Sequence, residues 1–179
     1  MLPLPVSRPW PVLAAAAVLA ACSPTFNWRE VPIAEAGLVA LLPCKPDRAE
    51  RALPLGAESV RIAMAGCEAG GATFAVAHAS ANDPAQAEAW LIAWRAATRS
   101  QLGAVQAAEA PATLKNAAAG PAPVRLEAEP PQPGAAPVRV LWFAQRQKDG
   151  RVALYQATVL GRPTAPDAVS AFFEGLRLP

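Results

Sequence analysis

The chain of 179 residues is poor in the residues and motifs on which most enzymes depend. It contains a single histidine, His78, and it has no Gly-x-Ser-x-Gly elbow, no His-Glu-x-x-His pair and no glycine-rich phosphate loop. Ser80 and Asp83 follow His78 closely, but Asp83 is better explained as a helix cap. A lone histidine has no second catalytic partner that the sequence identifies. The sequence therefore predicts a protein that is not an enzyme and carries no cofactor.

An excess of charge of either sign is also missing. The chain has 16 Lys and Arg against 14 Asp and Glu, a formal net charge of +2 at pH 7. Proteins that bind nucleic acid usually carry a basic stripe or patch, and no run of like charge occurs here. The sequence therefore predicts no nucleic-acid partner.

The chain lacks a long hydrophobic run, but a short one lies near its amino terminus. Residues 12–21 are about ten consecutive apolar residues, whereas a membrane-spanning helix needs roughly 20. One positive charge, Arg8, and no acidic residue precede this run. A short apolar segment behind a basic start is typical of a secretory signal peptide. A buried Ala-rich helix fits less well, because Pro9 and Pro11 lie where it would begin.

The end of this run resembles the lipobox of bacterial lipoproteins. The stretch Leu19-Ala20-Ala21-Cys22 has the pattern at which such a signal is cut just before a lipid-bearing cysteine. The resemblance implies a signal peptide over residues 1–21, a short tether over residues 22–25 and a single domain over residues 26–179. It also implies a diacylglycerol thioether on Cys22, an acylated amino terminus and attachment to a membrane. An ordinary secretory signal without a lipid is the alternative.

The residue after Cys22 bears on which membrane the protein reaches. Ser23 stands there rather than Asp, which disfavours retention at the inner membrane in lineages that follow this sorting rule. We therefore expect the protein on the periplasmic side of the outer membrane, with the inner membrane as the less favoured location.

Three cysteines are present, and a lipid on Cys22 would leave an even pair, Cys44 and Cys67. In an oxidising periplasm such a pair predicts a disulfide, which would stabilise the fold by roughly 3 kcal/mol. Two free buried thiols are an alternative. A metal or redox site fits less well, because metal sites usually need three or four ligands and redox pairs are usually Cys-x-x-Cys. We therefore expect a structural disulfide and no metal.

Apolar alternation and turn residues indicate six strands and two helices in residues 26–179. The strands are expected over residues 37–42, 60–65, 72–79, 124–128, 138–145 and 152–160. A long helix is predicted from Asp83, an N-cap followed by Pro84 and Gln86, to Gly103. A second helix is predicted from residues 164–166 onward, where apolar residues again recur at helical spacing.

Three tryptophans are the candidates for ligand binding. Trp90 and Trp94 lie one turn apart on the long predicted helix, and Trp142 lies on a predicted strand. Such a set could bind a small apolar or aromatic molecule. A tryptophan pair at helical spacing is more often core packed against a sheet, and that interpretation is favoured.

Together the elements predict an α+β fold, with a single antiparallel sheet of five to six strands, one long central helix and one C-terminal helix. Their order resembles the PsbP/Mog1-like architecture, an α/β sandwich. Two stretches carry the resemblance locally: residues 41–46, with an apolar-Pro-x-x-Pro pattern, and residues 171–178, which match the closing helix and final extended segment. The run from Trp28 to Ala77 also resembles small lipoproteins of proteobacteria.

The resemblance implies an assembly or interaction factor, because known members of the PsbP/Mog1-like group act in that way without a shared catalytic site. We therefore expect a non-enzymatic, membrane-anchored module that binds an envelope protein through a sheet edge or through residues 121–137. The alternative is a carrier or sensor of a small apolar or aromatic ligand beside Trp90, Trp94 or Trp142. A hydrolase is a distant third.

Overall fold

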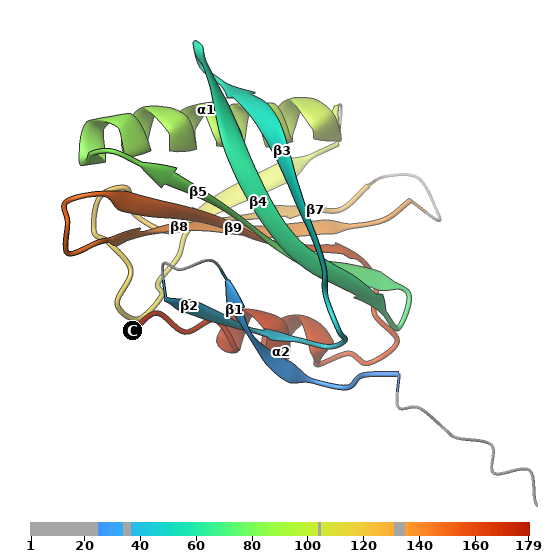
Figure 1. Ribbon diagram of the computed structural model, residues 1–179. Coiled ribbons are helices and arrows are strands. Elements are labelled where there is room, and N and C mark those ends of the chain that lie inside the picture. The colour runs from blue at the N-terminus through green and yellow to red at the C-terminus, as the bar shows by residue number, and fades with distance from the viewer. Residues whose placement is uncertain (1–24, 34–36, 104, 131–134) are drawn as a thin grey trace, which may run out of the picture.

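The computed structural model describes residues 25–33, 37–103, 105–130 and 135–179. The predicted signal peptide, residues 1–21, and the predicted lipidation site Cys22 lie outside these residues. Figure 1 shows the arrangement of the elements. The strands are β1 (Arg29–Ile33), β2 (Leu38–Leu42), β3 (Asp47–Leu55), β4 (Glu58–Ala69), β5 (Ala72–Ala81), β6 (Ala107–Pro111), β7 (Val124–Ala128), β8 (Val138–Arg146) and β9 (Val152–Gly161). The helices are α1 (Pro84–Leu102) and α2 (Ala168–Glu174).

Seven of these strands form one antiparallel sheet, and the other two form a separate hairpin. The order in the large sheet is β3-β4-β5-β9-β8-β7-β6, so β3 and β6 are its edges. In the described part of the chain, β1 and β2 pair as strands only with each other, from Arg29↔Leu42 to Ile33↔Leu38.

The predicted fold class is wrong, because the chain is richer in strands than expected. In place of a single sheet of five to six strands with one long central helix, there is a seven-stranded sheet, a two-stranded sheet and two helices. The missed strands are β1, β3 and β6. Strand β3 is exposed along nearly its whole length, and β6 lies in an Ala-rich segment. Neither therefore shows the apolar alternation by which a half-buried strand is identified.

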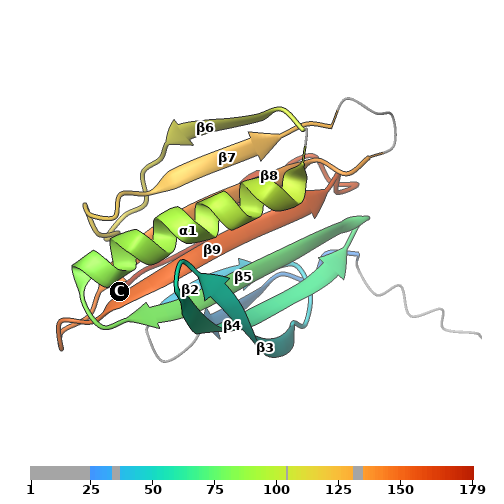
Figure 2. The ribbon, with the colours of Figure 1, turned by 90° about the horizontal axis from the view of Figure 1, so that it is seen from above.

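Helix α1 lies across one face of the large sheet (Figure 2). The side chain of Asp83 accepts a hydrogen bond from the backbone N–H of Gln86 at 2.9 Å, and the side-chain oxygen of Gln86 accepts one from the backbone N–H of Asn82 at 2.8 Å. This capping box starts the helix, and Gly103, at a φ of 64°, ends it. The predicted caps are thereby confirmed. The helix buries Ala87, Trp90, Leu91 and Trp94.

The opposite face of the sheet is covered by the β1–β2 hairpin and α2. Phe74 of β5 and Phe172 of α2 pack edge to face there, with ring centroids 5.5 Å apart. The C-terminal segment continues the hairpin: the backbone N–H of Val39 donates to the carbonyl of Arg177 at 2.9 Å, and that of Arg177 donates back at 2.8 Å. The sheet thus separates two apolar cores, which hold its central strands in place.

Candidate functional site

Strands β4 and β5 stop pairing before either strand ends. Their register runs from Ala69↔Ala72 to Ala63↔His78. Beyond that point β4 extends back to Glu58 and pairs only with β3, while β5 extends on to Ala81 and pairs only with β9, among the described residues. In Figure 1 the β3–β4 hairpin turns away from the rest of the sheet. We call the opening between the two strands the β4–β5 cleft.

The β4–β5 cleft has a volume of about 940 Å³, within the size range of small-molecule and peptide sites. Its walls are formed by Glu58, Ser59, Val60 and Arg61 on β4 and by His78, Ala79 and Ser80 on β5. In an antiparallel strand, alternate residues direct their N–H and C=O groups to opposite sides. Both walls therefore present main-chain hydrogen-bonding groups that no neighbouring strand uses.

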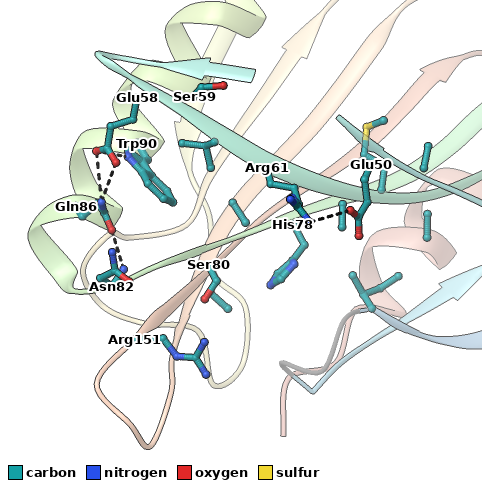
Figure 3. A pocket seen from close by; sticks show the side chains of 18 of the residues that line it. Glu50, Glu58, Ser59, Arg61, His78, Ser80, Asn82, Gln86, Trp90 and Arg151 are labelled. Atoms are coloured by element: carbon teal, nitrogen blue, oxygen red, sulfur yellow. Dashed lines mark hydrogen bonds and ion pairs between the residues drawn. The ribbon is translucent and has the colours of Figure 1, made fainter. Parts of the chain in front are cut away.

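Glu58 ties the start of β4 to the first turns of α1 (Figure 3). Its carboxylate accepts a hydrogen bond from the indole N–H of Trp90 at 3.0 Å and another from the side-chain N–H of Gln86 at 3.1 Å. The amide of Gln86 therefore uses its nitrogen for Glu58 and its oxygen for the helix cap. These contacts hold the hairpin against α1, and Gln86 and Trp90 line the cleft beneath it.

His78 lies at the apex of the cleft, where the two strands begin to diverge (Figure 3). Its ring centroid is 5.3 Å from that of Tyr155, and its Nε2 atom is buried without a hydrogen-bond partner among the described residues. Burial lowers the pKa of His78 below its ordinary value of 6.5. Burial therefore favours the neutral imidazole at pH 7.

Charged side chains of both signs surround the mouth of the cleft. Arg61 and Glu50 form an ion pair of 3.7 Å, in which both side chains are mostly exposed. Such a pair contributes little stability and leaves both groups open to other partners. Arg48 donates to the carbonyl of Pro32 at 2.9 Å, and Arg151, from the turn before β9, also lines the opening. The mouth can therefore bind polar groups of either charge.

The structure places the three predicted tryptophans in the core beneath α1. Trp94 and Trp142 are 3% and 0% exposed, so their rings are enclosed by protein. The indole N–H of Trp142 donates to the side chain of Gln156 at 2.8 Å. Only Trp90, of these three, also lines the cleft. Ligand binding by the set stays a prediction, and the geometry gives the three rings a packing role.

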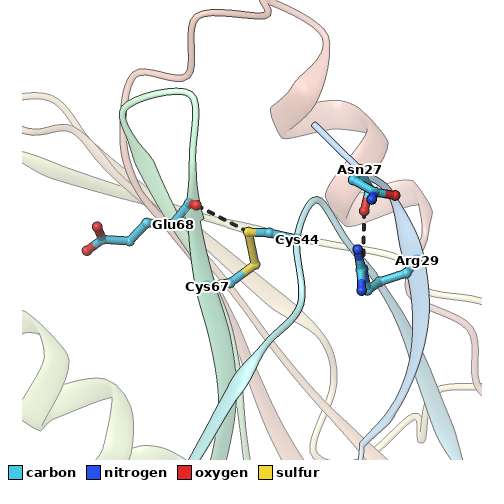
Figure 4. The surroundings of a disulfide bond; sticks show 5 residues. All are labelled: Asn27, Arg29, Cys44, Cys67 and Glu68. Atoms are coloured by element: carbon cyan, nitrogen blue, oxygen red, sulfur yellow. Dashed lines mark hydrogen bonds between the residues drawn. A yellow bond between two sulfur atoms is a disulfide. The ribbon is translucent and has the colours of Figure 1, made fainter. Parts of the chain in front are cut away.

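The disulfide predicted between Cys44 and Cys67 is confirmed (Figure 4). The two Cα atoms are 6.0 Å apart, a usual separation for a bonded pair. The Sγ atom of Cys44 also lies 3.3 Å from the carbonyl oxygen of Glu68. A disulfide sulfur carries no proton, so this approach is a contact and not a hydrogen bond. The disulfide lies outside the β4–β5 cleft and serves the packing of the two sheets.

A second opening lies beside α2, and we call it the α2 groove. It has a volume of about 1400 Å³ and combines apolar side chains with a basic rim. The apolar lining includes Leu114, Leu141, Val169, Phe173 and Leu178. The charged lining consists of Lys115, Arg125, Arg139, Arg162 and Arg177 with Glu127 and Glu174.

Within residues 25–33, 37–103, 105–130 and 135–179, no three His, Cys, Asp or Glu side chains gather in a way that could hold a metal ion. Over the same residues, neither helix has the length and apolar character needed to cross a membrane.

Only part of the cleft can be predicted from the sequence. The sequence points to His78 and Trp90 but not to Glu58, Arg61 or Arg151. Glu58 and Arg61 lie on β4, whereas Arg151 lies just before β9. These segments meet only in the fold, and no local motif marks the three residues. The position of Gln86 could be predicted from the sequence, because the side chain of a capping box lies at the start of its helix.

No protein-family model matches the chain, and no curated protein sequence matches it.

Proposed function

We propose that this protein is a lipid-anchored, non-enzymatic interaction module of the cell envelope, and that the β4–β5 cleft binds an extended segment of a partner protein. One observation carries the proposal. Strands β4 and β5 both continue past Ala63↔His78, the last pair of their register, and leave two strand edges facing a cleft.

An extended peptide is the ligand that unpaired strand edges fit best. A strand added to a free edge gains main-chain hydrogen bonds, and pockets for its alternate side chains provide specificity. In the cleft, the edge of β4 offers five residues, Glu58–Ile62, and that of β5 offers Ala79–Ala81. The exposed hydroxyl of Ser80 then provides a side-chain contact in the cleft.

The anchor in this proposal is a lipid on Cys22, on the periplasmic side of the outer membrane. Phe26, four residues after Cys22, already packs against the core of the domain. Four extended residues span roughly 14 Å, so the domain would be held close to the membrane. A partner bound in the cleft would then be an envelope protein that reaches the same membrane surface.

The cleft is tested by placing a photoreactive phenylalanine at Ser80 or Ser59 in the native host. The matched control position is Ile92, a side chain of α1 that is 57% exposed and lies outside the cleft. We expect both cleft positions to crosslink one partner, at a single short stretch of its sequence, and Ile92 to give no such product. Equal crosslinking from Ile92, or none from Ser80 and Ser59, would contradict the proposed site.

The anchor is tested separately with Cys22→Ala. We expect this variant to leave the membrane fraction and to lose the crosslinked partner. If the variant keeps the partner at the native level, anchoring is not needed for binding, and that part of the proposal fails.

A second candidate function, the carriage of a small apolar ligand, is favoured by the apolar lining of the α2 groove. Native mass spectrometry of protein purified from its host distinguishes it, since a carrier retains a small molecule of constant mass. Replacing Phe173 of the groove by Arg should abolish that retention and leave crosslinking from Ser80 intact.

A further inference from the structure

We propose that two copies of this chain associate through the outer edges of their β3 strands, antiparallel, with Ala49 of one copy opposite Ala49 of the other. This inference stands apart from the proposed function, because it uses a different edge of the sheet. Strand β3 ends the strand order and pairs on one side only, with β4, within the described part of the chain. Figure 1 shows it as the outermost strand beside β4.

The side chains of this edge are open to solvent. Residues 47–52 are all exposed, and only Leu55 at the far end of the strand is buried. Pro46 and Pro54 bracket the exposed stretch. A proline lacks the N–H group of a sheet ladder, so pairing between strands is favoured over the residues between the two prolines.

The charge pattern of this stretch is complementary to that of a second, antiparallel copy of the same stretch. Its sequence is Asp47-Arg48-Ala49-Glu50-Arg51. When two such strands pair antiparallel about Ala49, Asp47 lies opposite Arg51 of the second copy, and Arg48 lies opposite Glu50. The two-fold symmetry repeats both pairs, so all four cross-strand pairs join opposite charges. Directly opposite unlike charges stabilise an antiparallel pair, and like charges destabilise it.

Neighbouring registers lose this complementarity. A shift by one residue places Arg48 opposite Arg51 in one direction and Asp47 opposite Glu50 in the other. A shift by two residues places Arg48 opposite Arg48 or Glu50 opposite Glu50. Register in a two-stranded pair is otherwise weakly specified when both faces are polar. The charge pattern therefore selects a single arrangement, centred on Ala49.

The contacts that these side chains already make are compatible with the pairing. Asp47 and Arg51 form no ion pair with any described residue. Among the described residues, Glu50 is paired only with the exposed Arg61, at 3.7 Å. Arg48 donates one hydrogen bond to the carbonyl of Pro32, and its guanidinium has further N–H groups to offer.

A five-residue edge is smaller than a standard stable interface, so association in solution should be weak and salt-sensitive. Arg48 and Glu50 also line the β4–β5 cleft. The two-fold axis that relates the two copies would be perpendicular to the sheet. The paired β3 strands would then join both sheets into one, and both clefts would lie on the same face of it.

The test uses the chain from Ser23 to Pro179, which retains every residue of both cores, and follows its self-association by sedimentation equilibrium at low salt. We expect a concentration-dependent dimer. Asp47→Arg or Arg51→Asp alone places like charges opposite each other twice and should weaken association about tenfold. The double variant Asp47→Arg/Arg51→Asp restores opposite charges in the same register and should recover the dimer.

A heterodimer experiment tests whether unlike charges on the two β3 edges drive the association. The variant Asp47→Arg/Glu50→Arg is positive at all four charged positions, and Arg48→Glu/Arg51→Glu is negative at all four. Each should be monomeric alone, and a one-to-one mixture should form a heterodimer. A wild-type chain that stays monomeric up to millimolar concentration, a dimer that the single charge reversals leave unchanged, or a mixture that does not associate would each overturn the proposal.

Discussion

Cys44, just past the end of β2, is bonded to Cys67 near the end of β4, and this bond joins the two sheets covalently. No strand pairing connects those sheets in the described residues. The disulfide and the apolar core around Phe74 and Phe172 therefore hold the β1–β2 hairpin in place. The hairpin is also the first element after the proposed anchor, so any load on the tether would reach the large sheet through this corner.

Removing the disulfide should destabilise the fold without abolishing it. The bond closes a loop across a sequence separation of 23 residues, for which chain entropy predicts a loss of about 3 kcal/mol in the free energy of unfolding. The double variant Cys44→Ala/Cys67→Ala and the reduced wild-type chain should agree with each other in urea unfolding. An unfolding midpoint that reduction leaves unchanged would show that the bond contributes nothing.

Glu58 should contribute to stability because its carboxylate accepts a hydrogen bond from the buried indole N–H of Trp90. Trp90 is 7% exposed, so Glu58→Ala would leave its N–H without a partner and lower the free energy of unfolding by about 1–3 kcal/mol. Glu58→Gln keeps an acceptor oxygen and should cost less. The matched control is Glu88→Ala, a carboxylate on the exposed side of α1. Equal urea midpoints for the two alanine variants would contradict this role.

Local signals in the sequence were sufficient for the capped and half-buried elements. Asp83, Pro84 and Gln86 form a capping box wherever they fold, because the contacts span only a few residues. The hairpin β4–β5 is likewise marked by Gly70, which adopts a φ of 57° at the turn. These features depend on the chain within one turn or hairpin, so they could be predicted.

The remaining features depend on tertiary structure, so they could not be predicted from the sequence. Strand β3 is exposed on both faces, so its sequence carries no apolar alternation, and its pairing with β4 decides its conformation. The cleft arises where β4 and β5 diverge, and the register at which their pairing stops has no local mark. Glu58, Arg61 and Arg151 line one cleft with His78 only because β4, β5 and the start of β9 meet in the fold.

Trp142 should behave as a core residue rather than as a ligand contact. It is fully buried, and its indole N–H donates to Gln156. Trp142→Ala should lower the free energy of unfolding by about 3–5 kcal/mol, as expected for a large cavity in a packed core. Ile92→Ala on the exposed side of α1 should change it by less than about 0.5 kcal/mol. A stable Trp142→Ala variant would return this residue to the candidates for ligand binding.

Stability should fall on acidification because of His78. The folded-state pKa of this residue is lowered by burial, whereas the unfolded chain binds its proton near pH 6.5. Between the two pKa values the unfolded state binds more protons, so the free energy of unfolding rises with pH and the full contribution is present above about pH 6.5. His78 is the single histidine, and histidine is the side chain whose ordinary pKa lies between pH 5 and 7. Urea unfolding across that window should show the slope in the wild type and none in His78→Gln. The imidazole proton resonance should titrate below pH 6.5, and a titration at or above that value would contradict the buried, neutral state.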